Sequence, residues 1–179
     1  MKNVLKEILS TSVYLLVVLL ITYLVVQYVG QRTQVVGDSM KNTLHDGDNL
    51  LVDKLSYRFK DPERFDVIVF PYQHEENTYY IKRIIGMPGE TIRIEQDGKI
   101  IINDEVLEEN YGKEIIKDPG QASTEIVLSE DEYFVLGDNR NNSTDSRSPS
   151  VGNIRREDIL GKAFIRIWPI YEFELLKHQ

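Results

Sequence analysis

The chain has 179 residues, of which 41% are hydrophobic, and its formal net charge is -8; this length suits one domain or a domain with an anchor. The negative charge argues against nucleic acid as a partner, because a surface that follows phosphates must be basic. Cysteine is absent, and none of the three histidines lies in an H-x-x-x-H spacing, so disulfides and thiol nucleophiles are excluded and neither a metal nor a cofactor is expected.

An uncharged, mostly apolar run covers residues 8–31 near the N-terminus. As a helix it would measure roughly 36 Å at about 1.5 Å per residue, which is enough to cross a hydrocarbon core of about 30 Å. A cleavable signal peptide would have a shorter apolar region and a small-x-small exit, whereas Tyr28 stands two places before Gly30. The sequence therefore predicts a retained, single-pass transmembrane anchor over 8–31, behind a short N-terminus over 1–7, rather than a buried core helix.

Positive charges flank this run on both sides. Lys2, Lys6 and the terminal amine precede it, and Arg32 and Lys41 follow it. The positive-inside bias favours a cytoplasmic N-terminus. Residues 32–179 are then expected to form an extracytoplasmic domain.

Beyond the anchor, short strand-like runs alternate with turn residues, as in an all-β barrel or sandwich. Eight strands are expected, over residues 49–55, 66–70, 78–85, 90–96, 99–104, 124–128, 132–137 and 163–168. Asp97-Gly98 indicates a two-residue hairpin, and a short helix is expected at RREDILG, ended by Gly161. Residues 91–128 include an acidic, poorly patterned stretch and are predicted to form a small insertion on the β core.

Ser39, within VVGDSMKNTLHDGD (35–48), is a candidate nucleophile or an ordinary turn hydroxyl. As a nucleophile it needs a base. The segment lacks the second glycine of a G-x-S-x-G elbow, and no S-x-x-K occurs in the chain. A triad based on His45 would need Asp46 or Asp48 to bend round and hold the imidazole.

A different base is available in YIKRIIGMPGE (80–90), where Lys82 and Arg83 are adjacent in an apolar run. On a strand their side chains point to opposite faces, and the alternation does not decide which one points inward. Arginine stays protonated, whereas burial lowers a lysine pKa by up to about 3–5 units and makes it a competent base. The alternative is a lysine whose stem packs while its amine reaches water.

A dense set of short polar side chains follows an apolar strand in LGDNRNNSTDSR (136–147). It is either an exposed loop or a buried polar network. In a network, a hydroxyl would hold a neutral lysine amine, and Asp145 and Arg147 would brace the loop as a pair.

Four segments carry a resemblance to a known family. SMKNTL (39–44), RFDVIVF (64–70), KRIIGMPGE (82–90) and GDNRNNSTDSR (137–147), in this order behind one anchor, resemble the bacterial type I signal peptidases, or leader peptidases. The resemblance implies a mainly β fold, with a folded sheet or barrel core and a small β insertion. It also implies a membrane-anchored serine endopeptidase with a Ser/Lys dyad, which removes signal peptides from secreted preproteins at the outer face of the cytoplasmic membrane. Cleavage would follow a small-x-small (Ala-x-Ala-like) site and pass through an acyl-enzyme.

The resemblance also assigns roles to residues. Ser39 would be the nucleophile, Lys82 the general base, and Ser143 the hydroxyl that orients the lysine amine. Asp145 and Arg147 match the bracing pair, and Asp138 opens the same loop motif.

The substrate pocket departs from the family in two places. Met40 would line the pocket, and the backbone N–H of Ser39 would be one oxyanion donor. Gly37 stands where part of the family has a serine hydroxyl as second donor, so the second donor is left open, as backbone or water. Asn42 stands where proline is usual, and because proline stiffens a turn by fixing φ, we expect a modest effect on activity.

Two other functions fit the residues. One is a catalytically silent, membrane-anchored assembly or binding protein on the same scaffold. The other is a self-cleaving Ser/Lys protease with a related β fold, as in some repressor-type regulators. That class would need a cytosolic domain and a DNA-binding segment, and neither is visible in this sequence.

Overall fold

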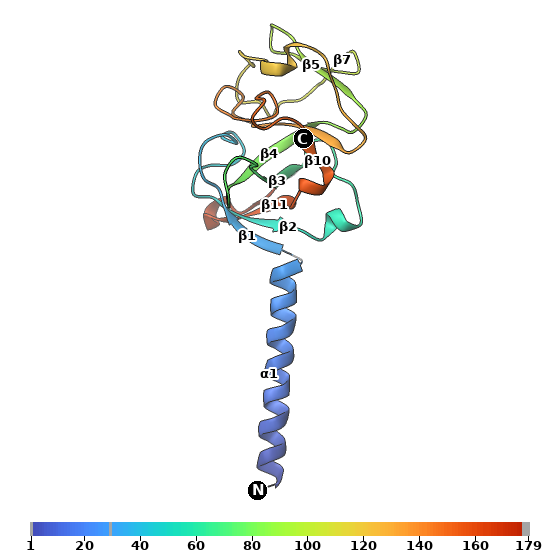
Figure 1. Ribbon diagram of the computed structural model, residues 1–179. Coiled ribbons are helices and arrows are strands. Elements are labelled where there is room, and N and C mark those ends of the chain that lie inside the picture. The colour runs from blue at the N-terminus through green and yellow to red at the C-terminus, as the bar shows by residue number, and fades with distance from the viewer. Residues whose placement is uncertain (1, 29, 177–179) are drawn as a thin grey trace.

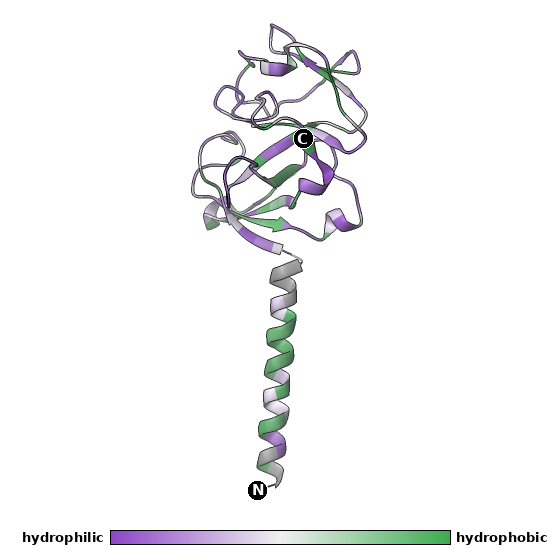
Figure 2. Cartoon of the chain, in the orientation of Figure 1, coloured by the Kyte–Doolittle hydropathy of each residue, from purple (hydrophilic) through white to green (hydrophobic). Residues whose placement is uncertain are grey.

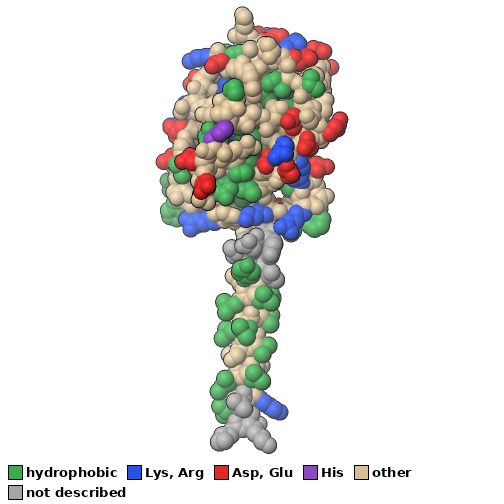
Figure 3. Space-filling model, in the orientation of Figure 1, with side chains coloured by type: hydrophobic (Ala, Val, Ile, Leu, Met, Phe, Trp, Pro, Cys, Tyr) green, Lys and Arg blue, Asp and Glu red, His purple; other side chains and the backbone are tan. Residues whose placement is uncertain are grey.

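The computed structural model describes residues 2–28 and 30–176, and it consists of a long N-terminal helix and a β domain (Figure 1). Helix α1 runs from Lys2 to Tyr28. Its segment Lys6–Tyr23 is long and apolar enough to cross a membrane and is not buried against the rest of the chain. Figure 2 shows the apolar middle of this helix standing clear of the domain, and Figure 3 shows Lys and Arg side chains gathered on the end of the domain next to it.

The helix differs from the predicted anchor over 8–31 at both ends. It begins at Lys2, because Lys and Glu are good helix formers and continue the helix beyond the apolar run. It ends at Tyr28, and Gly30 and Gln31 instead belong to the first strand. Glycine is a poor helix former, which favours this early end.

The larger sheet has eight antiparallel strands in the order β1-β2-β11-β3-β4-β9-β10, with β12 paired to β11. Their bounds are β1 Gly30–Gln34, β2 Asn49–Asp53, β3 Val67–Pro71, β4 Tyr79–Gly86, β9 Glu132–Leu136, β10 Ile154–Arg155, β11 Gly161–Trp168 and β12 Glu174–Leu175. The mainly β fold predicted from the sequence is thus confirmed.

The smaller sheet has the order β7-β6-β5-β8 and lies at the end of the domain farthest from α1 (Figure 1). Its strands are β5 Thr91–Ile94, β6 Ile100–Ile102, β7 Glu105–Val106 and β8 Ile126–Val127, all within the predicted insertion over 91–128. A hairpin joins β5 to β6 as predicted, but its turn is longer than two residues: Gly98 N–H donates to the Glu95 carbonyl, and Glu95 N–H donates to the Lys99 carbonyl.

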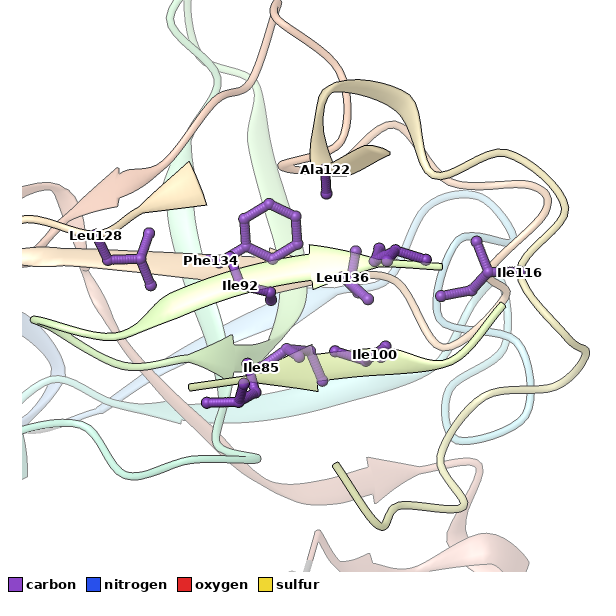
Figure 4. Packing of buried hydrophobic residues seen from close by; sticks show 10 residues of the cluster. Ile85, Ile92, Ile100, Ile116, Ala122, Leu128, Phe134 and Leu136 are labelled. Atoms are coloured by element: carbon purple, nitrogen blue, oxygen red, sulfur yellow. The ribbon is translucent and has the colours of Figure 1, made fainter. Parts of the chain in front are cut away.

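Buried aliphatic side chains hold the two sheets together. Figure 4 shows Phe134 of β9 next to Ile92 of β5, and Ile85 of β4 and Leu128 belong to the same buried cluster. A second cluster lies beneath the Ser39 turn and contains Met40, which is 1% exposed. Both faces of β4 and β9 are therefore buried over most of their length, which holds these strands rigidly.

The prediction of a short helix at RREDILG is wrong. This segment contains the end of β10 and a single 3-10 turn, η3, over Arg156–Asp158, because the few residues between β10 and β11 are too few for an α-helix of useful length. The other 3-10 turns are η1 Ser56–Arg58, η2 Gly120–Ser123 and η4 Ile170–Glu172.

Candidate active site

Ser39 lies in a tight turn between β1 and β2. Leu44 N–H donates to the Met40 carbonyl at 2.9 Å and closes the turn. From the facing loop, Asn139 N–H donates to the Ser39 carbonyl at 3.0 Å, and Asn139 Nδ2 donates to the Asp38 carbonyl at 3.0 Å. The loop over 137–147 therefore holds the backbone of Ser39 on one side.

Lys82, in the middle of β4, meets Ser39 across the domain core. Lys82 Nζ and Ser39 Oγ are hydrogen-bonded at 2.9 Å, although they are 43 residues apart in the chain. The amine also donates to the Ile81 carbonyl at 3.0 Å, and the Tyr80 ring centroid lies 4.8 Å away. Lys82 is 3% exposed, so its amine is withdrawn from water instead of reaching it.

Burial lowers the pKa of Lys82 to about 8, and the carboxylates of Asp145 and Asp138 act in the opposite direction without cancelling this effect. With that pKa, about a tenth of the molecules carry a neutral amine at pH 7, compared with about one in a few thousand for an ordinary lysine. The enclosure therefore supplies a usable population of base at neutral pH.

Arg83 is buried as well, on the opposite face of β4, and it is 2% exposed. It donates to Asp138 Oδ1 through Nε at 2.9 Å and to Oδ2 through Nη2 at 2.7 Å. Thr43 Oγ1 donates to Asp138 Oδ2 at 2.5 Å. Arg83 and Thr43 were not predicted as site residues; the available signal was a second charge on a buried strand, which requires a partner of opposite sign.

The predicted bracing pair lies beside the same loop. Arg147 Nε and Nη2 donate to the two carboxylate oxygens of Asp145, each at 2.8 Å. Asp145 Oδ2 also accepts Gly137 N–H at 3.1 Å. Both side chains are buried, so a charge-assisted, bidentate contact fixes the loop.

Ser143 reaches the site but makes no hydrogen bond to the lysine amine among the described residues. Its Oγ is buried and has no hydrogen-bond partner within residues 2–28 and 30–176. A Cβ built on Gly137 would collide with this oxygen and with the Ser39 carbonyl, so Ser143 Oγ lies immediately beside the Ser39 turn. In this conformation the Ile81 carbonyl, rather than Ser143, is the second partner of the amine.

A cleft of about 560 Å³ opens beside Ser39 and Lys82, lined by residues 33–40 and 77–82 with Asn142 and Thr144. Edge strand β1 is one wall, and within the described part of the chain it pairs with β2 alone. The start of β4 is the other wall, and it has a free edge because pairing with β9 begins only at Arg83. Two unpaired strand edges thus face the same opening.

The two predicted pocket residues differ in what they offer. Met40 lines the cleft and packs into the core. Gly37 also lines it, at φ +88, but its N–H donates to Asp46 Oδ1 at 2.8 Å and is therefore engaged. Ser39 N–H has no partner among the described residues, which leaves it available to an oxyanion.

His45 is exposed and belongs to a different cluster. Ligand atoms of His45, Asp48 and Glu172 lie within 4.8 Å of one another. The Arg166 guanidinium, however, donates to Asp48 Oδ2 at 3.2 Å and lies 3.5 Å from Glu172. A cation would be repelled by this fixed positive charge. Asp48 is thus paired with Arg166, rather than holding the His45 ring for a triad.

Comparison with known proteins identifies the family to which this chain belongs. A family model described as signal peptidase, peptidase S26, matches residues 7–168. The chain is 40% identical over 154 residues to a protein from Synechocystis sp. named probable signal peptidase I-2, which covers 83% of this chain and 68% of that protein.

The chain is also 34% identical over 182 residues to signal peptidase I U from Bacillus subtilis, covering 98% of this chain and 95% of that protein. A crystal structure of a signal peptidase I from Enterococcus faecalis aligns with a TM-score of 0.45 and 32% identity, over 57% of this chain and 97% of that chain. Because the family model spans most of its length, the chain belongs to the signal peptidase family, peptidase S26, and is a serine endopeptidase that cleaves signal peptides.

Proposed function

We propose that Ser39 and Lys82 form a catalytic dyad that cleaves signal peptides through an acyl-enzyme, after a small-x-small site. The observation that carries this proposal is the 2.9 Å contact between Lys82 Nζ and Ser39 Oγ, with the amine 3% exposed. A serine hydroxyl becomes a nucleophile when a base within hydrogen-bond reach takes its proton.

The reaction proceeds in two halves. Neutral Lys82 takes the hydroxyl proton as Ser39 Oγ bonds to the scissile carbonyl carbon, and the Ser39 N–H donates to the developing oxyanion. The Lys82 ammonium then gives its proton to the leaving amine as the C–N bond breaks. Water then attacks the ester carbonyl as Lys82 takes a proton from it. The Lys82 ammonium returns this proton to Ser39 Oγ as the ester C–O bond breaks, which releases the acid product and restores the Ser39 hydroxyl. The carboxylates of Asp145 and Asp138 favour the transient ammonium.

Asp145 and Arg147 brace the loop that holds Ser39, and Ser143 assists the amine. Ser143 Oγ is buried without a partner among the described residues and lies against the Ser39 turn. Rotation of its hydroxyl toward the amine would supply a missing partner for both groups.

The substrate binds as an extended strand between the free edges of β1 and β4, where backbone pairing supplies affinity. Met40, Val35 and Ile81 are apolar residues that line the cleft next to the dyad. These side chains are also nearly buried, so the space beneath the substrate is shallow. Small side chains at the first and third positions before the cut fit such walls.

We propose the membrane topology that the sequence predicts. Helix α1 anchors the chain in the cytoplasmic membrane as a single span, with residues 1–7 inside and the catalytic domain, residues 32–179, outside. Residues 91–128 form its insertion. Signal peptides occupy the same bilayer, and tethering enzyme and substrate to one surface raises their effective concentration. This mechanism uses neither a metal nor a cofactor.

The test compares the full-length wild type with Ser39→Ala and Lys82→Ala on a preprotein whose signal ends in Ala-x-Ala. We expect both variants to lose at least about a thousandfold in kcat, since triad-type groups act as a unit. Exposed residues of the same types provide matched controls, Ser123→Ala and Lys99→Ala, which should cleave at the wild-type rate. Near-normal turnover by Lys82→Ala would refute the dyad, and normal folding without acylation by a serine-directed inhibitor would favour a silent binding protein.

A further inference from the structure

Asn42, three residues after Ser39, is the most unusual backbone position near the site. Its φ is +135, in a region that residues other than glycine rarely occupy. Proline, whose ring fixes φ near -65°, has no access to this conformation. The Asn42 side chain also binds a residue that is distant in the sequence. Its Nδ2 donates to the Tyr111 carbonyl at 3.0 Å, and the two residues are 69 positions apart.

The acceptor belongs to an irregular stretch of the insertion, residues 109–113, which we call the clasp segment. Two further contacts join it to the loop that carries the site. Lys113 N–H donates to the Asp138 carbonyl at 2.8 Å, and Arg140 Nη1 donates to Glu109 Oε1 at 2.7 Å. Both Arg140 and Glu109 are nearly buried in this pair. The clasp segment therefore touches the Ser39 turn and the facing loop at once.

The Tyr111 side chain is buried against Arg83 and Phe65. It is 3% exposed, its ring centroid lies 3.8 Å from Arg83 Cζ, and it packs against the Phe65 ring at 5.0 Å. A guanidinium over an aromatic face is attracted to it, more strongly where water is excluded. Arg83 in turn holds Asp138, so one residue of the insertion supports both the buried ion pair and the catalytic turn.

We infer that Asn42 is a positioning residue, and that the clasp segment uses it to hold Ser39 within reach of Lys82. This inference rests on the proposed dyad. A turn strained at Asn42 and released from Tyr111 would relax, and the Ser39 hydroxyl would leave its 2.9 Å contact with the amine. Small displacements of a nucleophile reduce the rate strongly, because near-attack geometry carries much of the catalysis. Proline would stiffen this turn by fixing φ. Asn42 instead holds the turn through its hydrogen bond to Tyr111 of the insertion.

The decisive variant is Asn42→Gly, because glycine adopts positive φ freely. The turn can keep its backbone conformation, but it loses the hydrogen bond to Tyr111 and gains the freedom to move. We expect kcat per titrated active site to fall about fivefold to tenfold, as for the loss of one partly buried hydrogen bond, while KM changes by less than about twofold. Active sites are counted by acylation with a serine-directed inhibitor. A role in folding alone would lower that count and leave kcat per site unchanged.

Asn103→Gly is the matched control. Asn103 also has positive φ, at 49, and its side chain accepts Thr91 N–H at 2.9 Å, but it lies in the smaller sheet away from Ser39. Its kcat per site should equal that of the wild type. If Asn42→Gly does not fold, Asn42→Asp keeps the size of the side chain, removes the donor, and should show the same fall in kcat. Wild-type kcat in a folded Asn42 variant overturns the inference, whereas activity in Ser39→Ala would overturn the dyad itself.

Discussion

Arg83 and Asp138 form a buried, bidentate ion pair on the opposite face of β4 from the Lys82 amine. The two bonds measure 2.9 and 2.7 Å, and the side chains are 2% and 0% exposed. Because neighbouring residues of a strand point to opposite faces, β4 carries a base toward the cleft and a structural cation toward the loop. The pair fixes the start of that loop, from which Asn139 reaches the Ser39 carbonyl.

Arg83→Lys should therefore destabilise the protein while keeping the charge. An ammonium lacks the planar fork that binds both carboxylate oxygens, and loss of one charge-assisted bond should lower the free energy of unfolding by about 1.5–3 kcal/mol. Urea denaturation of the detergent-solubilised chain measures this. The control is Arg93→Lys, whose side chain is 37% exposed and should change stability by less than about 0.5 kcal/mol. Equal effects of the two variants would mean that the buried pair adds nothing.

The lowered pKa of Lys82 gives a second prediction, for activity against pH. The neutral amine is the base, so kcat/KM should rise with pH around a midpoint near 8. Between pH 7 and pH 9 the neutral fraction grows about tenfold, and the rate should follow. Initial rates on a soluble peptide substrate, measured from about pH 6 to about pH 10.5 so that the plateau above the midpoint is covered, test it. A profile that is flat, or one that keeps rising until above pH 10, contradicts a desolvated base.

The same burial predicts that Lys82 reduces stability. Its pKa is about 8 in the folded protein, against 10.5 for an ordinary lysine. The folded state therefore carries the burial penalty of the ammonium in full below pH 8, and wild-type stability should increase as pH rises from about 8 to 10.5. Lys82→Met should accordingly raise the free energy of unfolding at pH 7, by up to about 3 kcal/mol at 1.36 kcal/mol per pKa unit.

This gain should fall to a small remainder by about pH 10.5, where the folded lysine is neutral and half of the unfolded molecules have lost the proton as well. Denaturation curves for Lys82→Met and the wild type at pH 7 and pH 10.5 provide the comparison. Lys99→Met is the control, because that exposed lysine sits in a hairpin at the surface. If Lys82→Met is less stable than the wild type at pH 7, the amine is better accommodated than its burial indicates.

Strands were predictable where their side chains alternate or form apolar runs. Each of the eight predicted strands coincides with an observed one, because burial of one or both faces imposes these patterns. Strand β1, GQRTQ, was missed because it is polar and mostly exposed at the sheet edge. Strands β7, β10 and β12 have two residues each, which is too short to show a period.

The residues of the site were predictable only where they belong to a recognisable sequence motif. The structure brings Ser39 and Lys82 together and pairs Asp145 with Arg147. The hydrogen bonds that support these residues were not predicted, because they join positions far apart in the sequence. Arg83 and Asp138 are 55 positions apart, and Asn42 and Tyr111 are 69 positions apart. No local pattern specifies such contacts.

Gly137 lies where the loop over 137–147 packs against the Ser39 turn. A Cβ there would collide with Ser143 Oγ and lie 2.5 Å from the Ser39 carbonyl, which is part of the backbone and has little room to move. Overpacking of this kind costs about 1–3 kcal/mol, and here it would also push the nucleophile away from Lys82. We expect Gly137→Ala to fold with reduced stability and to lose at least about a hundredfold in kcat, as for other displacements of a reacting group.

Gly152→Ala is the control, since its Cβ would meet nothing within 4 Å; that variant carries only backbone strain and should cleave normally. A Gly137→Ala enzyme with wild-type turnover would show that the Ser39 turn tolerates displacement, and would count against a rigidly positioned dyad.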